Sequence, residues 1–177
     1  LDSDGDMDAL SASENDRKMM WYDNNGSQSF TVRTINTAAI GPSSVYAVDV
    51  DSDGDIDVLS SSVDDKIIWY ENDANQDWPG YSITTSADNA YSVYAVDVDS
   101  DGDIDVLSAS AADDKIAWYE NNGSQSFTTR TVVTNADNAQ SVYAIDLDSD
   151  GDIDILSASR SDDKITWYAN NGSQSFT

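Results

Sequence analysis

Residues 47–59 read Ala-Val-Asp-Val-Asp-Ser-Asp-Gly-Asp-Ile-Asp-Val-Leu, and versions of this stretch recur along the whole chain of 177 residues. Its centre, Asp-Ser-Asp-Gly-Asp-x-Asp, occurs four times at spacings of 49, 48 and 49 residues, beginning at Asp2, Asp51, Asp99 and Asp148. Trp-Tyr recurs in step with it, at 21–22, 69–70, 118–119 and 167–168. A repeat of about 50 residues is typical of propeller blades rather than of helical solenoids.

Each repeat contains four short runs of residues that favour strands. The first run covers 44–50, 92–98 and 141–147, and the second starts at Ile56, Ile104 and Ile153. The third run starts at Lys66, Lys115 and Lys164, and the fourth starts at Phe30, Trp78, Phe127 and Phe176. Asn-Gly, a hairpin signal, follows the third run in most repeats. No window has a sustained helical period. The sequence therefore predicts an all-β fold, a β-propeller built of four-stranded antiparallel blades.

The chain is out of phase with this unit. Leu1 aligns with Val50, so the first repeat has no first strand, and Thr177 falls at the start of the last outer strand. We expect blades at about 1–43, 44–91, 92–140 and 141–177. Propeller closure usually pairs strands from both chain ends. We therefore expect a fragment of a larger propeller, or end blades completed by another chain through self-association.

The composition excludes several classes of function. With 34 acidic against 8 basic residues, the net charge of −26 would repel nucleic acid and anionic membranes. There is no cysteine and no histidine, which removes the usual nucleophile, general base and zinc ligand, so we do not expect an enzyme. No apolar stretch approaches 18 residues, so we expect no membrane insertion. Five Trp, nine Tyr and three Phe at regular places supply a core.

The aspartate loops predict a metal. Each full loop has Asp at positions 1, 3, 5, 7 and 9 and Gly at position 6, where the chain must turn sharply. Carboxylates this crowded repel one another, and a divalent cation compensates for the repulsion. Six to eight oxygen ligands in a flexible loop suit Ca²⁺ better than Mg²⁺. We expect three to four Ca²⁺ ions, one per loop, held by side chains at positions 1, 3, 5 and 9 and by the carbonyl at position 7. The predicted ligand residues are Asp2, Asp4, Asp6, Asp8, Asp49, Asp51, Asp53, Asp55, Asp57, Asp97, Asp99, Asp101, Asp103, Asp105, Asp146, Asp148, Asp150, Asp152 and Asp154.

Two other interpretations of the loops are weaker. An EF-hand needs a bidentate Glu at position 12 and flanking helices, whereas position 12 here is Ser60, Ser108 or Ser157 and strand-like residues follow. Acidic turns that are merely solvated are common, but four copies in register disfavour that explanation.

These residues resemble the FG-GAP/VCBS repeat family. The matching pattern is the loop at 47–59 followed by Trp-Tyr-Glu-Asn-Asn-Gly-Ser-Gln-Ser-Phe at 118–127, and the resemblance covers essentially the whole chain. Relatives include the integrin α-subunit propeller and bacterial surface propellers. The resemblance implies calcium ligands at positions 1, 3, 5, 7 and 9, an extracellular setting, and a role in adhesion, carbohydrate or protein binding, or scaffolding.

A ligand surface is harder to find in the sequence. The repeated Trp residues are expected to pack between blades, since Ile67 and Trp69 share a face of their strand. Trp78-Pro-Gly-Tyr81 breaks the repeat, which makes Trp78 and Tyr81 the candidates for binding an extracellular glycan or protein. Two alternative functions stay open: an accessory propeller of a secreted polysaccharide-degrading enzyme, and a pure scaffold or assembly unit.

Overall fold

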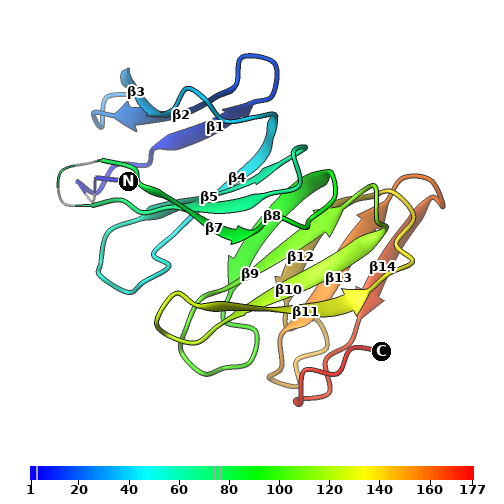
Figure 1. Cartoon of the computed structure of the whole chain (residues 1–177). Coiled ribbons are helices and arrows are strands. Elements are labelled where there is room, and N and C mark those ends of the chain that lie inside the picture. The colour runs from blue at the N-terminus through cyan, green and yellow to red at the C-terminus, as the bar shows by residue number, and fades with distance from the viewer. Residues whose placement is uncertain (3, 74, 76) are drawn as a thin grey trace.

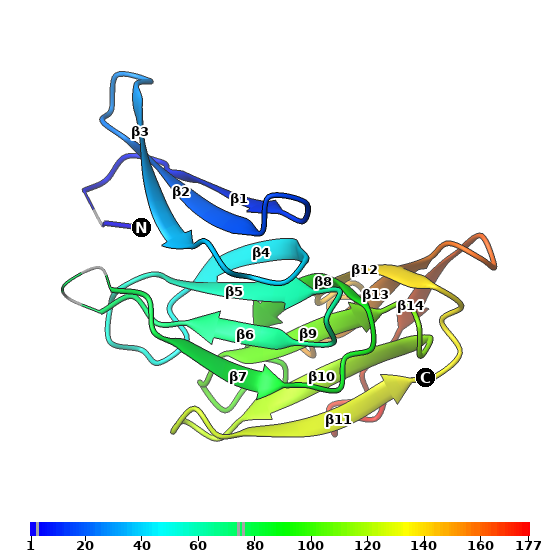
Figure 2. The ribbon, with the colours of Figure 1, turned by 45° about the horizontal axis from the view of Figure 1, so that its top comes forward.

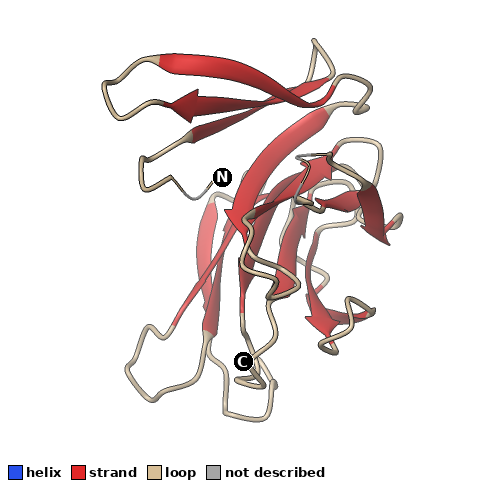
Figure 3. Ribbon diagram, turned by 90° about the vertical axis from the view of Figure 1, so that its left-hand side faces the viewer, coloured by secondary structure: helices blue, strands red, loops and turns tan. Residues whose placement is uncertain are grey.

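The structure is a computed structural model that describes residues 1–2, 4–73, 75 and 77–177. The elements in this part of the chain are strands joined by turns and loops (Figures 1 and 3). They are β1 (Ala9–Ser13), β2 (Lys18–Asn24), β3 (Phe30–Asn36), β4 (Pro42–Val48), β5 (Asp57–Ser62), β6 (Ile67–Tyr70), β7 (Gly80–Thr84), β8 (Ala90–Val96), β9 (Asp105–Ser110), β10 (Lys115–Asn121), β11 (Phe127–Val133), β12 (Ala139–Ile145), β13 (Asp154–Ser159) and β14 (Lys164–Tyr168). None of the described residues forms a helix suited to crossing a membrane.

The strands form four antiparallel sheets, one for each sequence repeat. We name them blade 1 (β1–β2–β3), blade 2 (β4–β5–β6–β7), blade 3 (β8–β9–β10–β11) and blade 4 (β12–β13–β14). Figure 2 shows the sheets following one another in chain order, from blue blade 1 to orange and red blade 4. Within each sheet, strands that are consecutive in the chain are hydrogen-bonded neighbours. The predicted all-β fold of propeller blades is confirmed.

The first strands of blades 2, 3 and 4 end two residues earlier than predicted. β4 covers 42–48 rather than 44–50, and β8 and β12 are displaced in the same way. The reason is local: the amide of Val50 donates a hydrogen bond of 3.0 Å to the Asp57 carboxylate, so it takes no part in the sheet. The aspartate loop therefore begins before the expected end of the strand.

The outer strands also differ from the prediction in two blades. β7 begins at Gly80 rather than at Trp78, and its first residues follow a segment that contains Pro79, which cannot donate to a sheet. Phe176 makes only an isolated antiparallel bridge with Asn170, so blade 4 has three strands.

Each blade has two faces, because neighbouring residues of a strand point to opposite sides. We call them the Trp face and the Tyr face, after the Trp-Tyr pair of the third strand. The Trp face of blade 2 packs on the Tyr face of blade 3, in a buried cluster that includes Leu59, Ile67, Trp69, Val106, Ala117 and Tyr119.

The same interface recurs at the other two junctions. Between blades 3 and 4 the cluster includes Leu107, Ile116, Trp118, Val142, Ala144 and Ile155, and between blades 1 and 2 it includes Met19, Trp21, Ile35, Val58 and Tyr70. The core of the protein thus consists of layers between blades, and each layer joins a Trp face to the next Tyr face.

The repeated Trp residues pack between blades with one exception. Trp21, Trp69 and Trp118 are 1%, 5% and 2% exposed, whereas Trp167 of blade 4 is 43% exposed. The expectation therefore holds for three repeats and is wrong for the fourth, because no described blade lies against the Trp face of blade 4.

The first strands of the blades carry a row of tyrosines. Tyr46, Tyr94 and Tyr143 lie side by side, with ring centroids 4.8 and 4.7 Å apart. Burial, followed by contact with the other two hydroxyls, raises the pKa of Tyr94 well above its usual value. The row joins blades 2, 3 and 4 along their first strands.

Candidate metal centre

The aspartate loops connect the first and second strands of the blades, and the loop of blade 3 shows how they fold. Ser100 and Gly102 have φ of +63° and +98°, so the chain turns twice through the left-handed region. No atom would lie within 4 Å of a side chain at position 102, so glycine is needed there for its backbone conformation and not for space. The amide of Gly102 donates a 3.0 Å hydrogen bond to Asp97 Oδ2, which closes the loop.

These turns bring carboxylates together in each loop. In each group one oxygen from every member lies within 4.8 Å of the others; the groups are Asp49–Asp51–Asp53, Asp97–Asp99–Asp101, Asp146–Asp148–Asp154 and Asp2–Asp4–Asp23. Positions 1, 3 and 5 therefore converge in blades 2 and 3. In blade 4 position 9 joins positions 1 and 3, and Asp150 of position 5 is outside the group.

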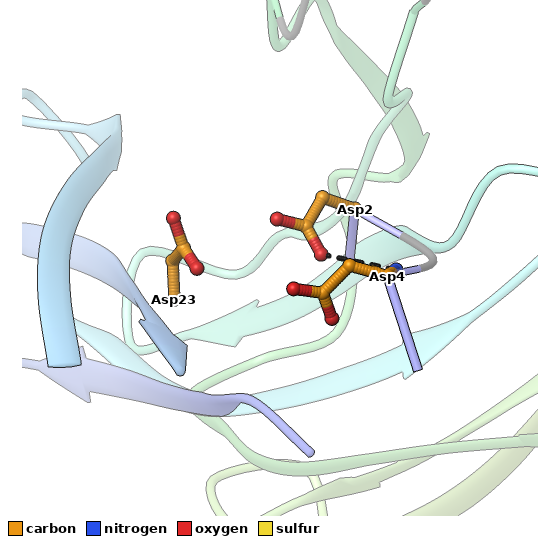
Figure 4. Close-up of side chains that lie close together, drawn as sticks. All are labelled: Asp2, Asp4 and Asp23. Carbon is orange, nitrogen blue, oxygen red and sulfur yellow. Dashed lines mark hydrogen bonds between the residues drawn. The ribbon is translucent and has the colours of Figure 1, made fainter. Parts of the chain in front are cut away.

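The first loop gathers a residue that the sequence pattern does not predict. Asp23, from β2, faces Asp2 and Asp4 across this loop (Figure 4). Asp23 directly follows Trp-Tyr, where the next two repeats have Glu71 and Glu120. The signal was present in the sequence as an acidic residue after Trp-Tyr in three repeats, but only the strand pairing shows that it approaches the loop.

Position 9 holds the loop to the rest of its blade. Asp105 is fully buried, and its carboxylate accepts hydrogen bonds from the amides of Val98 (3.0 Å) and Asn121 (2.8 Å). Asp57 and Asp154 accept the corresponding pairs of bonds in blades 2 and 4. In blade 1, Asp8 accepts from the Asn24 amide (2.8 Å) and from the α-amino group of Leu1 (2.5 Å).

The surroundings of position 9 change its acidity. Burial raises the pKa of Asp57 to about 6 and that of Asp105 to about 7, even though two amides favour the ionised form of each. For Asp8, burial acts in the same direction, but the α-amino group and the Asn24 amide outweigh it and lower the pKa. A buried carboxylate at position 9 is thus a structural anchor, and each of its oxygens keeps a lone pair.

The aspartate side chain at position 7 lies against the Asn-Gly-Ser turn of its own blade. A Cβ on Gly123 would lie 2.5 Å from Asp103 Oδ2, and Gly26 and Gly172 stand in the same relation to Asp6 and Asp152. Glycine in Asn-Gly-Ser is therefore favoured by its positive φ, and a larger residue there would also have to displace the carboxylate at position 7. The side chains at position 7 lie outside the four groups, which is compatible with a role for their backbone carbonyls alone.

Two carboxylate oxygens of the aspartate loops are left without a donor, as are Asp113 Oδ1 and Asp162 Oδ1 in the turns before the third strands of blades 3 and 4. Among the described residues, Asp49 Oδ1 and Asp99 Oδ1 are buried from water and accept no hydrogen bond. Burial and then the neighbouring carboxylates raise the pKa of Asp51 and of Asp99. Buried acceptors without donors, surrounded by like charge, are costly unless a cation satisfies them. The donor set is all oxygen, which fits a hard divalent cation.

A second layer of contacts surrounds the acidic residue after Trp-Tyr. Arg33 pairs with Asp23 (2.7 Å) and lies 5.1 Å from the Trp21 ring centre. Arg130 pairs with Glu120 in the same way and lies 5.6 Å from the Trp118 ring centre. Each arginine therefore contacts both the acidic residue after Trp-Tyr and the tryptophan ring of the same strand.

The two predicted ligand-binding aromatics lie apart. Tyr81 is 48% exposed and packs at 5.1 Å on Trp69 within blade 2, where it also contacts Glu71, which raises its pKa. Trp78 is half-buried and packs edge-on against Trp21 of blade 1, with ring centres 6.4 Å apart. The structure thus places them against different blades.

Comparison with known families agrees with the repeat and the loops. The profile of the FG-GAP-like repeat family matches residues 1–60, 49–108 and 97–157. The chain belongs to the FG-GAP-like repeat family. Each match starts within one aspartate loop and ends shortly after the next one. The aspartate loop is therefore part of the family pattern that this FG-GAP-like chain matches.

Known structures agree with the fold. The crystal structure of BBS1N in complex with ARL6DN, soaked with lead, matches with a TM-score of 0.67 at 12% identity, over 100% of this chain and 52% of that chain. The FG-GAP-like chain thus spans about half the length of that protein, and the likeness shows the fold alone. No curated protein sequence matches it.

Proposed function

We propose that the aspartate loops bind Ca²⁺ and that the ions stabilise the blades. In blades 2 and 3 the aspartates at positions 1, 3 and 5 would hold the ion, and in blade 4 those at positions 1, 3 and 9 would hold it. In blade 1 the ion would be held by Asp2, Asp4 and Asp23. Bound calcium supplies positive charge where the chain has a formal charge of −26. The observation that carries the proposal is the pair of buried oxygens, Asp49 Oδ1 and Asp99 Oδ1, that accept no hydrogen bond.

The test is unfolding in Ca²⁺, Mg²⁺ or excess chelator, together with calorimetric counting of bound ions. We expect three to four Ca²⁺ ions and a large rise in melting temperature that is specific to Ca²⁺. A site that binds only the folded chain adds about 2.7 kcal/mol when the free ion is at 100 times its Kd. An unchanged melting temperature and no bound ion would contradict the proposal.

At the level of the whole chain, we infer a non-catalytic binding module of a secreted or cell-surface protein, which contacts a glycan or protein through its loops and surface. Membership of the FG-GAP-like family supports this, as does the absence of Cys and His from the sequence. Tyr81, on the outer strand of blade 2, is the more exposed of the two predicted aromatics and is the candidate for such a contact. A glycan array probed with the chain and with Tyr81→Ala tests it; no binding to any glycan or matrix protein would count against it.

A further inference from the structure

Arg130, on the outer strand of blade 3, acts on the aspartate loop of that blade. It is the register partner of Trp118 across β10 and β11, and its guanidinium lies 5.6 Å from the Trp118 ring centre. Glu120 is two residues further along β10 and therefore on the same face, where it pairs with Arg130. The hydrogen bond to Glu120 and, after it, the charge of Asp99 raise the pKa of Arg130. The guanidinium thus interacts with the carboxylate at position 3 of the loop as well as with Glu120.

Blade 2 has a neutral side chain at the same place in the repeat. Tyr81 is the register partner of Trp69, packs on its ring at 5.1 Å and contacts Glu71. The contact with Glu71 raises the pKa of Tyr81, so the hydroxyl keeps its proton at neutral pH. Burial raises the pKa of Asp51, at position 3 of this loop, and the charges of Asp53 and then Glu71 add to the rise. Blades 2 and 3 therefore have the same carboxylates in the loop and after Trp-Tyr, and on the outer strand they differ by one positive charge.

We propose that the outer-strand residue opposite the repeated Trp sets the affinity of the aspartate loop for its cation, so that the loop of blade 2, beside Tyr81, binds Ca²⁺ more tightly than the loop of blade 3, beside Arg130. This inference rests on the proposed binding of Ca²⁺. The guanidinium lowers the affinity in two ways: it repels an incoming cation, and it neutralises Glu120, whose charge would otherwise attract the ion. Tyr81 leaves the full charge of Glu71 to act on its loop.

The size of the effect follows from the exposure of the ion pair. The side chains of Arg130 and Glu120 are 53% and 27% exposed, so water and salt weaken their interactions. We therefore expect the charge at position 130 to change the Kd of its loop by about three- to fivefold at low salt. The difference should shrink as the salt concentration is raised towards about 1 M, because the Debye length then falls to about 3 Å.

The experiment is a Ca²⁺ titration of the full chain, followed by nuclear magnetic resonance of the amides of Gly54 and Gly102. These glycines lie at position 6 of the loops of blades 2 and 3. Each amide donates a hydrogen bond of 3.0 Å to the carboxylate at position 1 of its own loop, so each reports on its own site.

Three variants move the charge, and a fourth is the control. Arg130→Gln removes the charge from blade 3, Arg130→Lys keeps it without the planar guanidinium, and Tyr81→Arg adds it to blade 2. Arg160→Gln is the matched control, because Arg160 is exposed in the turn between β13 and β14, at the end of blade 4 opposite its aspartate loop.

In the wild-type chain, we expect Gly54 to respond at a lower Ca²⁺ concentration than Gly102. Arg130→Gln should lower the midpoint at Gly102 by about three- to fivefold and leave that at Gly54 unchanged, and Arg130→Lys should shift it less. Tyr81→Arg should raise the midpoint at Gly54, and Arg160→Gln should change neither midpoint.

Unchanged midpoints in Arg130→Gln and Tyr81→Arg would overturn this inference and leave calcium binding intact. A shift in Arg130→Lys as large as that in Arg130→Gln would also overturn it, because packing on Trp118 and not charge would then be the cause. If neither glycine responds to Ca²⁺, the proposed calcium binding is wrong and the inference falls with it.

Discussion

Blades 3 and 4 have nearly the same sequence and very different surroundings. Their third strands read Lys-Ile-Ala-Trp-Tyr and Lys-Ile-Thr-Trp-Tyr. Yet Ile116 and Trp118 are 0% and 2% exposed, whereas Ile165 and Trp167 are 78% and 43% exposed. The repeat therefore determines the strand and the direction of each side chain, but the neighbouring blade determines whether that side chain is buried.

The aspartate loops of the same two blades have the same surroundings, although the Trp faces of these blades do not. Asp105 and Asp154 are both fully buried, and each accepts two backbone hydrogen bonds of 2.8–3.1 Å. These partners all lie within one blade, so the anchor forms with or without a neighbour. Blade stability thus has a part that is local to the blade and a part that needs the next blade.

The largest expected difference between the two blades is in the cost of removing Trp. Trp118→Ala should destabilise the chain by about 3–5 kcal/mol, because it leaves a cavity between blades 3 and 4. Trp167→Ala should cost less than about 1.5 kcal/mol in a monomer, because the side chain is already partly in water. Urea unfolding of both variants at low protein concentration measures the two values.

Equal losses in the two Trp variants would break the comparison, since they would mean that Trp167 is buried in solution.

Substitution at position 9 should cost less stability than the loss of Trp118, and the cost should be the same in blades 3 and 4. Asp105→Asn and Asp154→Asn should each cost about 1–3 kcal/mol in chelator, because an amide nitrogen then faces a backbone N–H that has lost its acceptor. Asp99→Asn is the matched control: it removes a carboxylate that lies among like charges and accepts no hydrogen bond at Oδ1, so in chelator it should leave the chain at least as stable as before. Urea unfolding in chelator gives all three values, and a loss confined to blade 3 would show that the anchor depends on neighbours.

Some features depend only on residues close in the sequence, and others depend on another strand or blade. This difference also explains which features the sequence could predict. Asp49, Asp51 and Asp53 are within five residues of one another, so spacing alone was enough to bring their carboxylates together. Asp23 reaches the first loop from another strand, and its place depends on how β2 lies in the sheet. The exposure of Trp167 depends on a different blade altogether, so no pattern within its own repeat could predict it.

The smallest expected effect concerns the residue after Trp-Tyr, which is Glu120 in blade 3 and Ala169 in blade 4. Glu120 lies close enough to raise the pKa of Asp99, though less than burial does, and it is already paired with Arg130. A carboxylate at 169 would stand at the place in blade 4 that Glu120 holds in blade 3, so a cation bound in the loop should attract it. Ala169→Glu should therefore enlarge the stabilisation by Ca²⁺ by a few tenths to about 1 kcal/mol, in the range of a partly exposed ion pair.

The measurement for position 169 is the difference in unfolding free energy between Ca²⁺ and chelator, with Ala169→Gln as a neutral control of the same size. In chelator, Ala169→Glu should be slightly less stable than Ala169→Gln, because the new charge lies near Asp148 and Asp146. In Ca²⁺ the order should reverse. Identical behaviour of the two variants would mean that the acidic residue after Trp-Tyr acts on its arginine and not on the ion, and Asp23 would then have to be assigned the same role in blade 1.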